Sequence, residues 1–325
     1  MEGINIMRKV NFLSVVIPCH NEQEALSVSL ARLSSVLDAL CKSSKISDYE
    51  LIFVDNGSTD KTAEVLKEIF DGNTKAKVIS LRRNFGYQGS ISAGLYYAKG
   101  DAVVTIDADL QDPPEKIGEM LDYYETGFDL VLGIRQDRSA DSFLKKFFSE
   151  NYYRFMKFIG VEIVYNHGDF RLMSKSLVQE FNMLHERNRF IRAMVLQLES
   201  RYAKVFYKRS LRLAGKSKFD IKSLFSIGFD GVLSFSYVPL RIASLVGILL
   251  CFLAMLGVGW VFYIKIKTHV MPGWASTLLP ILGLGGFQLL MLGLIGEYIG
   301  RLYLEVKARP LFVVREFLAR KDENK

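Results

Sequence analysis

The chain has 325 residues, of which 50% are hydrophobic and 24% are charged, and its formal net charge is +7. This length accommodates about two soluble domains, or one domain and a membrane unit, and the mean hydropathy of +0.15 favours the second arrangement. The high apolar fraction and the 7 prolines exclude disordered and collagen-like chains. The 3 cysteines form no CxxC pair, which argues against a disulfide scaffold or a cysteine zinc site.

The first part of the chain alternates short β-branched runs with helical stretches. This alternation predicts an α/β fold with a mostly parallel sheet that is covered by helices on both faces. Ligands of such sheets bind beyond the carboxyl ends of the strands. We expect strands at 13–17, 51–54, 78–81, 103–106 and 130–132, and helices at 22–40, 62–70, 89–98 and 115–124.

Acidic residues follow several of these strands, and the pair after the fourth strand is the most informative. Asp107 and Asp109 point the same way if the strand continues, so both carboxylates can reach one divalent cation, Mg²⁺ or Mn²⁺. An isolated DxD motif is more often a helix cap or a surface turn; its place after a strand, among other acidic strand ends, favours the metal. The chain lacks GxGxxG after its first strand and lacks GxxxxGK[ST] throughout, which excludes those two phosphate-binding loops.

Two apolar runs without a charge, 242–264 and 270–296, lie towards the C-terminus. Each exceeds the roughly 20 residues that a helix needs to cross a bilayer. The alternative, a pair of buried helices in a soluble core, is disfavoured because core helices rarely run so far without a charged residue. We therefore expect a transmembrane hairpin within 238–305, with helices at about 242–264 and 274–299.

The basic residues predict how this hairpin is oriented. Eight Lys and Arg lie at 201–222 and more lie in a basic tail at 306–325, whereas the connector between the runs holds only Lys265 and Lys267. The positive-inside rule then places a domain at 1–220 and both termini in the cytoplasm, at the inner membrane. This topology accounts for the net positive charge of the chain, so binding to nucleic acid is not needed to explain it. An apolar stripe at 221–237 predicts an interfacial juxtamembrane helix, or alternatively a helix that faces the core.

Seven stretches of the chain resemble the family 2 glycosyltransferases. The resemblance is to the subgroup that loads a sugar onto a polyprenyl phosphate, the bactoprenol glucosyltransferases and dolichyl-phosphate mannosyltransferases. It covers nearly the whole chain, since bacterial members also end in two membrane helices. The stretches are VIPCHNE, VDNGSTD, RRNFGYQGS, DADLQDPP, GDFRLM, ERNRF and AGKSKF.

The resemblance implies a GT-A fold and a nucleotide-diphosphate sugar as donor. Asn56 stands where the family more often has Asp, and Tyr87 stands where Lys is frequent. The implied metal ligands for Mg²⁺ or Mn²⁺ are Asp107, Asp109 and Gln111, and Asp109 is also an implied catalytic residue. The implied nucleotide-binding residues are Pro18, His20, Glu22, Asp55 and Asp107.

The acceptor implied by the resemblance is a lipid phosphate. A phosphate monoester has a second pKa near ~6, so it is largely dianionic at neutral pH and is already a nucleophile. Arginine suits such a group because it can bind phosphate through two hydrogen bonds. The family also places an acidic residue near the attacking oxygen. Asp169 is therefore a candidate catalytic base, or alternatively a residue that positions an arginine or the sugar hydroxyls. The expected acceptor-phosphate ligands are Arg135, Arg171, Arg209, Arg212 and Lys218.

The sequence thus predicts a membrane-bound, inverting enzyme that moves one hexose, with glucose favoured, from a nucleotide-diphosphate sugar to undecaprenyl phosphate. A flippase partner would then carry the product outward, and the small membrane unit is compatible with a homo-oligomer. One alternative is a non-catalytic, membrane-anchored sensor or scaffold. Another is a polysaccharide synthase, against which the missing QxxRW motif argues.

Substituting the juxtamembrane arginines tests the acceptor prediction. We expect Arg209→Ala and Arg212→Ala to raise the KM for lipid phosphate more than the KM for the nucleotide sugar. Steady-state transfer assays with each substrate varied in turn measure both constants. Equal effects on the two substrates would remove these arginines from acceptor recognition.

Overall fold

The structure is a computed structural model that describes residues 8–136, 164–187, 189–208, 238–267 and 273–320. The chain divides into two compact units. Unit 1 takes in residues 1–158, 162–220 and 310–325, and unit 2 takes in 159–161 and 221–309. Residues 310–325 therefore belong to unit 1, although they follow unit 2 in the sequence.

Unit 1 is built on a sheet whose 8 described strands follow the order β7-β5-β6-β4-β1-β2-β3-β8. All five predicted strands are present as β1 to β5, and the predicted α/β fold with a mostly parallel sheet is confirmed. Among the described strands, β6 and β8 run against their neighbours. The strands are β1 (Phe12–Cys19), β2 (Asp48–Asp55), β3 (Ala76–Leu81), β4 (Ala102–Thr105), β5 (Leu130–Arg135), β6 (His167–Ser174), β7 (Tyr202–Tyr207) and β8 (Val314–Leu318).

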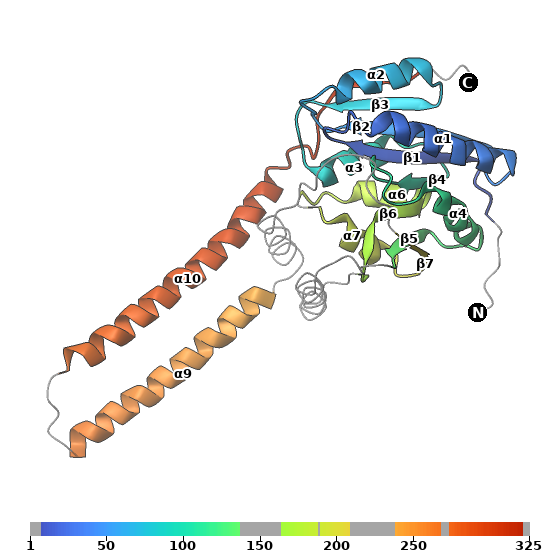
Figure 1. The fold of residues 1–325 in the computed structure, drawn as a ribbon. Coiled ribbons are helices and arrows are strands. Elements are labelled where there is room, and N and C mark those ends of the chain that lie inside the picture. The colour runs from blue at the N-terminus through green and yellow to red at the C-terminus, as the bar shows by residue number, and fades with distance from the viewer. Residues whose placement is uncertain (1–7, 137–163, 188, 209–237, 268–272, 321–325) are drawn as a thin grey trace. The chain divides into compact units, whose positions relative to one another are not determined.

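Helices cover both faces of this sheet (Figure 1). Alternate residues of β1 divide between the faces: Leu13 and Val15 join the core under α1, α2 and α4, whereas Val16 faces α3. Each face is thus a separate apolar layer, as expected for strands buried on both sides. The helices are α1 (Leu26–Lys42), α2 (Thr62–Gly72), α3 (Tyr87–Tyr97), α4 (Ile117–Glu125), α6 (Lys175–Met183) and α7 (Ile191–Leu198), with a short 3-10 helix at Pro114–Lys116.

The reversed direction of β6 determines which residues meet at the ligand-binding edge. β6 lies between β4 and β5 and is antiparallel to both. Its first residues therefore lie beside the carboxyl ends of the parallel strands. The register pairs Thr105 of β4 with Arg171 of β6, and two residues beyond these lie Asp107 and Asp169. Two acidic residues far apart in the sequence are thus brought to one edge of the sheet.

The C-terminal segment, predicted only as a basic tail at 306–325, contains a strand of the sheet. β8 pairs antiparallel with β3, the backbone N–H of Arg82 donates to the Val313 carbonyl over 2.9 Å, and the rings of Tyr97 and Phe317 lie 4.7 Å apart. Arg320 donates to the Phe70 carbonyl over 3.2 Å at the end of α2. The segment covers the β3 edge, which would otherwise present unpaired backbone groups.

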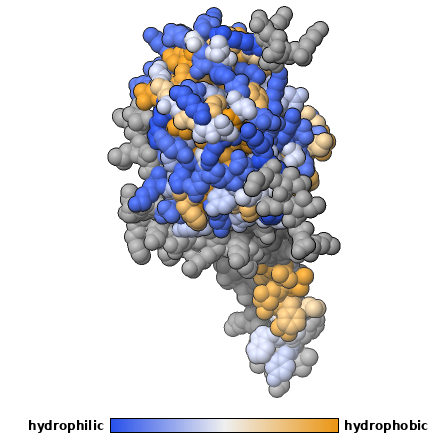
Figure 2. Space-filling model, turned by 90° about the vertical axis from the view of Figure 1, so that its right-hand side faces the viewer, coloured by the Kyte–Doolittle hydropathy of each residue, from blue (hydrophilic) through white to orange (hydrophobic). Residues whose placement is uncertain are grey.

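Unit 2 contains two long helices, α9 (Val238–Lys267) and α10 (Trp274–Val306), in the regions where membrane helices were predicted. Many of their large apolar side chains are exposed, Met255 and Leu289 among them, and Figure 2 shows hydrophobic side chains on the visible part of this unit. Within the described residues, no helix combines the length and the apolar character needed to cross a membrane. The predicted interfacial helix at 221–237 lies outside the described residues.

The packing of α3 on β1 and β2 offers a test of the fold near the site. A Cβ added at Gly94 would lie 2.2 Å from Cγ1 of Val16, whereas one added at Gly72 of α2 meets nothing within 4 Å. We expect Gly94→Ala to lower the free energy of unfolding of unit 1 by about 1–3 kcal/mol through overpacking. Gly72→Ala should leave it unchanged or raise it slightly. Thermal unfolding of the two variants measures the difference, and equal melting temperatures would contradict the described α3 packing.

Candidate functional site

The loop after β4 carries the acidic residues of the candidate site. Leu110 adopts a positive φ of 43°, and its N–H donates to the Asp107 carbonyl over 3.1 Å, which closes a tight turn. The Gln111 N–H donates to Oδ1 of Asp109 over 3.2 Å. Asp107 and Asp109 are partly exposed, whereas Gln111 and Asp112 are buried. The turn therefore leaves the two predicted metal-binding carboxylates accessible at the edge of the sheet.

Asp107 lies in a strongly acidic environment. Burial, followed by the charges of Asp169, Asp112 and Asp109, raises the pKa of Asp107 to about 7. The Tyr87 hydroxyl at the start of α3 donates to Oδ1 of Asp107 over 2.5 Å, which favours the charged form. Tyr87 thus supplies an uncharged donor to this carboxylate. The carboxylates repel one another unless a positive charge lies among them.

The donor set fits a hard divalent cation that shares its ligands with a substrate. Among the described residues, no group of three or more His, Cys, Asp and Glu side chains converges into a complete metal site. Two carboxylates and an amide, from Asp109, Asp107 and Gln111, supply oxygen only. Mg²⁺ and Mn²⁺ commonly bind through one or two carboxylates together with phosphate oxygens and water. Burial and the neighbouring carboxylates of Asp169, Asp112 and Asp109 raise the pKa of Asp107, so a cation bound among these carboxylates would relieve their repulsion.

The predicted nucleotide-binding residues occupy two different positions. Pro18 and Asp55 are buried, and Oδ1 of Asp55 accepts from the Ser58 N–H over 3.0 Å, so this carboxylate shapes the loop after β2. His20 is partly exposed, and its ring nitrogens lie 3.1 Å from the Asn56 carbonyl and 3.2 Å from the Asn84 amide. The His20 ring is therefore held in place by the loops after β2 and β3, at the rim of the candidate site.

Glu22 and Asn56 also order this rim. The Glu22 N–H donates to the Thr62 hydroxyl over 2.9 Å, at the first residue of α2. The Asn56 amide accepts from the Phe85 N–H over 2.9 Å and donates to Asn84 over 3.1 Å. A neutral amide at position 56 is thus used to join the loops after β2 and β3.

Asp169 forms the centre of a cluster at the start of β6. Its carboxylate binds two guanidiniums, those of Arg171 and Arg192, and the shortest contact with each is 2.6 Å. Burial opposes the charge of Asp169, but the two arginines hold the pKa of this carboxyl well below its usual range. Burial, followed by the same arginines, lowers the pKa of the adjacent His167 well below its usual range, so the imidazole is neutral.

A second cluster connects the acidic loop with β5 and β7. The Tyr207 hydroxyl donates to Asp112 over 2.7 Å, and Arg135 donates to Tyr207 over 3.2 Å and contacts Asp112 at 3.5 Å. A Cβ added at Gly168 would lie 3.0 Å from this arginine's guanidinium, so the absence of a side chain there lets Arg135 lie close. Arg135 is thus held at the edge with about a quarter of its side chain, 24%, exposed.

The predicted acceptor ligands are brought together only in part. Arg135 and the Asp169 cluster meet at the edge of the sheet, but Arg171 is fully buried beside Asp169 and is not placed to touch a ligand in this structure. Arg209, Arg212 and Lys218 lie outside the described residues.

Sequence reasoning did not identify Arg192 or Tyr207 as site residues. Arg192 lies two residues after the ERNRF stretch and is the one charged residue within α7, the helix IRAMVLQL, which was an available signal. Tyr207 ends β7, whose position beside β5 depends on a long-range pairing that no local pattern shows.

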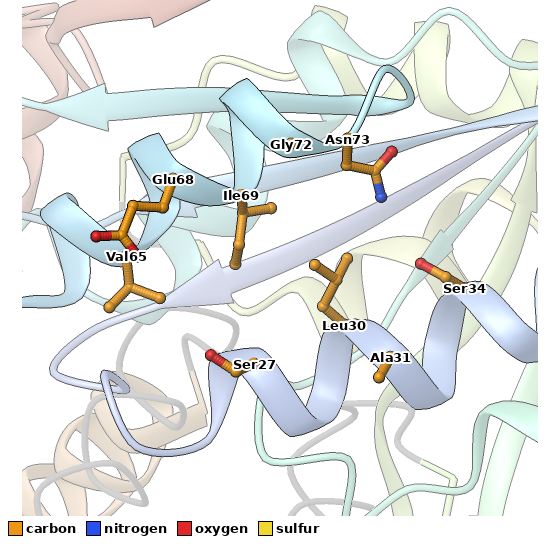
Figure 3. A pocket seen from close by; sticks show the side chains of 9 residues that line it. All are labelled: Ser27, Leu30, Ala31, Ser34, Val65, Glu68, Ile69, Gly72 and Asn73. Carbon is orange, nitrogen blue, oxygen red and sulfur yellow. The ribbon is translucent and has the colours of Figure 1, made fainter.

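A shallow groove of about 460 Å³ lies between α1 and α2 (Figure 3). None of the predicted site residues lines it, and Glu68 is the one charged residue along it. It therefore has no part in the candidate site. The lining residues are Ser27, Leu30, Ala31, Ser34, Val65, Glu68, Ile69, Gly72 and Asn73.

Comparisons with known proteins agree on one family. The family model described as Glycosyl transferase family 2 matches residues 14–181. The uncharacterized glycosyltransferase YkcC of Bacillus subtilis is 39% identical over 93% of this chain and 93% of its own length. The bactoprenol glucosyl transferase of Shigella phage SfII is 36% identical over 94% of this chain and 97% of its own length.

The likeness to solved structures is lower. Glucosyl-3-phosphoglycerate synthase from Mycobacterium tuberculosis, in complex with Mn²⁺, UDP-glucose and phosphoglyceric acid, is 19% identical and has a TM-score of 0.46. The match covers 69% of this chain and 78% of that chain.

The raised pKa of Asp107 predicts a stability effect without metal. Its folded value, about 7, exceeds the unfolded value of about 3.9. The folded state then binds more protons between these values, so the free energy of unfolding falls as pH rises from about 4 to 7. Asp107→Asn removes this loss, and we expect its melting temperature to exceed that of the unsubstituted protein by several degrees at about pH 8 and by less at about pH 5.

Thermal unfolding with a chelator present measures this difference. Glu68→Gln, on the exposed side of α2, is the matched control and should change the melting temperature little at either pH. A variant Asp107→Asn that is less stable than the unsubstituted protein at about pH 8 would contradict the described charge environment.

Proposed function

Because the chain belongs to glycosyl transferase family 2, we propose that it transfers one hexose, glucose in preference, from a nucleotide-diphosphate sugar to a polyprenyl phosphate. The observation that carries this proposal is the meeting of two opposite charge environments at one edge of the sheet. Asp107 and Asp109 lie on the acidic side, and Arg135 and Arg192 lie on the basic side. The bactoprenol glucosyl transferases, 35–36% identical over 93–94% of the chain, support the lipid acceptor and the sugar.

The acidic side suits the donor. Asp107, Asp109 and Gln111 would hold Mg²⁺ or Mn²⁺, which when bound would neutralise the charge of the departing diphosphate. His20 and Glu22 stand at the rim, where a nucleoside would lie beyond the carboxyl ends of β1 and β2. Pro18 and Asp55 would form the wall behind it.

The basic side suits the acceptor. An oxygen of the lipid phosphate would attack the anomeric carbon of the sugar as the bond to the diphosphate breaks, which inverts the configuration at that carbon. The dianionic phosphate needs no proton removed. Arg135, together with the predicted Arg209, Arg212 and Lys218, would bind its charge. The task of the protein is therefore to bring two anionic substrates together against their mutual repulsion.

The helices of unit 2 would anchor this site at the membrane. We place a transmembrane hairpin within α9 and α10, supported by the uncharged runs at 242–264 and 270–296 and by the exposed apolar side chains. The segment 221–237 would lie at the interface, with the α/β unit and both termini on the cytoplasmic side of the inner membrane. The lipid-linked sugar would then pass to a flippase. A homo-oligomer is compatible with so small a membrane unit.

A sugar-transfer assay separates this proposal from its alternatives. Membranes that contain the protein are supplied with undecaprenyl phosphate, Mg²⁺ or Mn²⁺, and a panel of radiolabelled UDP- and GDP-sugars. We expect a single labelled lipid from one donor. A growing polymer would favour a polysaccharide synthase, and silence across the panel would favour a sensor or scaffold.

Substitution of the acidic pair tests the donor side. We expect Asp109→Ala and Asp107→Ala each to reduce metal-dependent transfer by at least about 10²-fold, by analogy with the loss of one electrostatic stabiliser of the transition state. Membrane insertion should be unchanged, and Glu68→Gln serves as the control of equal charge change. Full activity in either alanine variant would remove that residue from the metal site.

A further inference from the structure

The carboxylate of Asp169 has both oxygens engaged by arginines. Oδ1 accepts from Nη2 of Arg171 over 2.6 Å and from Nε of Arg192 over 3.3 Å, and Oδ2 accepts from Nη2 of Arg192 over 2.6 Å. Arg192 therefore grips Asp169 through two nitrogens, a geometry that fixes the plane of a guanidinium. Asp169 itself is 7% exposed.

The two arginines differ in what else they can reach. Arg171 is fully buried, and its guanidinium also contacts the carbonyl oxygens of Gly168 and Asp169 at 3.4 Å each. The side chain of Arg192 is one-third exposed, at 33%. Of these two arginines, only Arg192 is thus placed to touch a ligand.

Both guanidiniums bind the carboxylate of Asp169, and His167 beside them is neutral. A third of the Arg192 side chain is exposed to solvent. Asp169 is meanwhile a weak proton acceptor, because the arginines hold its pKa well below the usual range.

The cluster stands at the same edge as the acidic loop. The charge of Asp169 contributes to the raised pKa of Asp107, and the charges of both Asp169 and Arg192 act on the Tyr87 hydroxyl that binds Asp107. The start of α7 is also tied to the start of α3, because the Ile191 N–H donates to the Gln88 side chain over 3.4 Å. Arg192 therefore lies beside the space in which the donor would present its sugar.

Resting on the function proposed above, we propose that Asp169 is a positioning residue that orients Arg192, and that Arg192 binds the phosphate of the lipid acceptor. Arg171 binds Asp169 from the buried side of the carboxylate. The donor's diphosphate has a cation to neutralise it, whereas the acceptor dianion needs charged donors from the protein. No proton leaves the acceptor, so the step has no need of a base at Asp169.

Kinetics of Arg192 variants test the binding role. We expect Arg192→Ala to raise the KM for undecaprenyl phosphate by about 10–100-fold, the loss expected for a charge-assisted hydrogen bond, while the KM for the nucleotide sugar stays within about twofold. Arg192→Lys keeps the charge but cannot bind Asp169 through two nitrogens. Its KM for undecaprenyl phosphate should lie between the values of the unsubstituted protein and of Arg192→Ala. Arg201→Ala removes an exposed arginine that stacks on Phe128 and is the matched control.

A readout without turnover accompanies these assays. Equilibrium binding of a fluorescent short-chain prenyl phosphate, with no donor present, should weaken in Arg192→Ala by the same factor as the KM rises. Unchanged binding and an unchanged KM for the lipid would overturn the proposal. A raised KM for the nucleotide sugar alone would overturn it too, by assigning Arg192 to the diphosphate.

Asp169→Asn tests whether Asp169 acts through Arg192. The amide keeps an acceptor for the buried Arg171, whereas alanine would leave that charge unpaired and endanger folding. We expect Asp169→Asn to raise the KM for lipid phosphate with most of kcat retained, and Asp169→Asn combined with Arg192→Ala to be no worse than Arg192→Ala alone. A kcat that falls at least about 10³-fold and is not restored by excess lipid phosphate would instead identify a proton acceptor.

An assay of the unsubstituted protein distinguishes a failure of the proposed function from a failure of the proposed role of Arg192. If it fails to transfer sugar to undecaprenyl phosphate, the proposed function fails. If it transfers sugar and Arg192→Ala matches Arg201→Ala in every constant, the function stands and the role of Arg192 is wrong.

Discussion

Arg171 has no solvent exposure, and a guanidinium in that position must be paired with an acid. The acid is Asp169, two residues earlier on the same strand and on the same face of the sheet. Because β6 runs antiparallel between β4 and β5, this buried pair stands where the parallel strands end. The rest of the site follows from that position. Arg192 attaches to the outer side of the carboxylate, and the acidic loop after β4 faces it.

The site concentrates charges that the fold alone does not need. Asp107, Asp109 and Asp112 lie close to one another and near Asp169, and their charges add to burial in raising the pKa of Asp107. A protein selected for stability alone would place an amide or an apolar residue at one of these positions. A bound cation relieves the repulsion between such carboxylates. The same residues that lower the stability of the protein without a cation would therefore strengthen the binding of a metal ion and of the diphosphate.

Local patterns predicted the first half of unit 1 well. The strands up to β5 have continuous apolar runs, and the acidic pair follows its strand directly, so both could be inferred from neighbours in the sequence. β6, β7 and β8 depend on pairing between distant segments, which periodicity does not encode. Arg171 illustrates the limit: an arginine in a motif suggested a phosphate ligand, and only the burial of its strand shows that its partner is Asp169. Arg192 was missed for the same reason, since its importance comes from a contact with a residue 23 positions away.

The pairing of β8 with β3 gives the chain an unusual order of assembly. The last strand of unit 1 is made after the whole of unit 2, so on the ribosome the β3 edge stays open until both long helices have been synthesised. Unit 2 is in this sense an insertion into the α/β unit and not an extension of it. A chain cut after residue 237 would lose a strand of the sheet as well as the helices, whereas joining residue 208 to residue 310 through a flexible linker would retain every described strand of unit 1. The chain passes from unit 1 to the long helices after residue 220 and returns at residue 310, and any attempt to separate these helices from unit 1 has to respect both of these crossings.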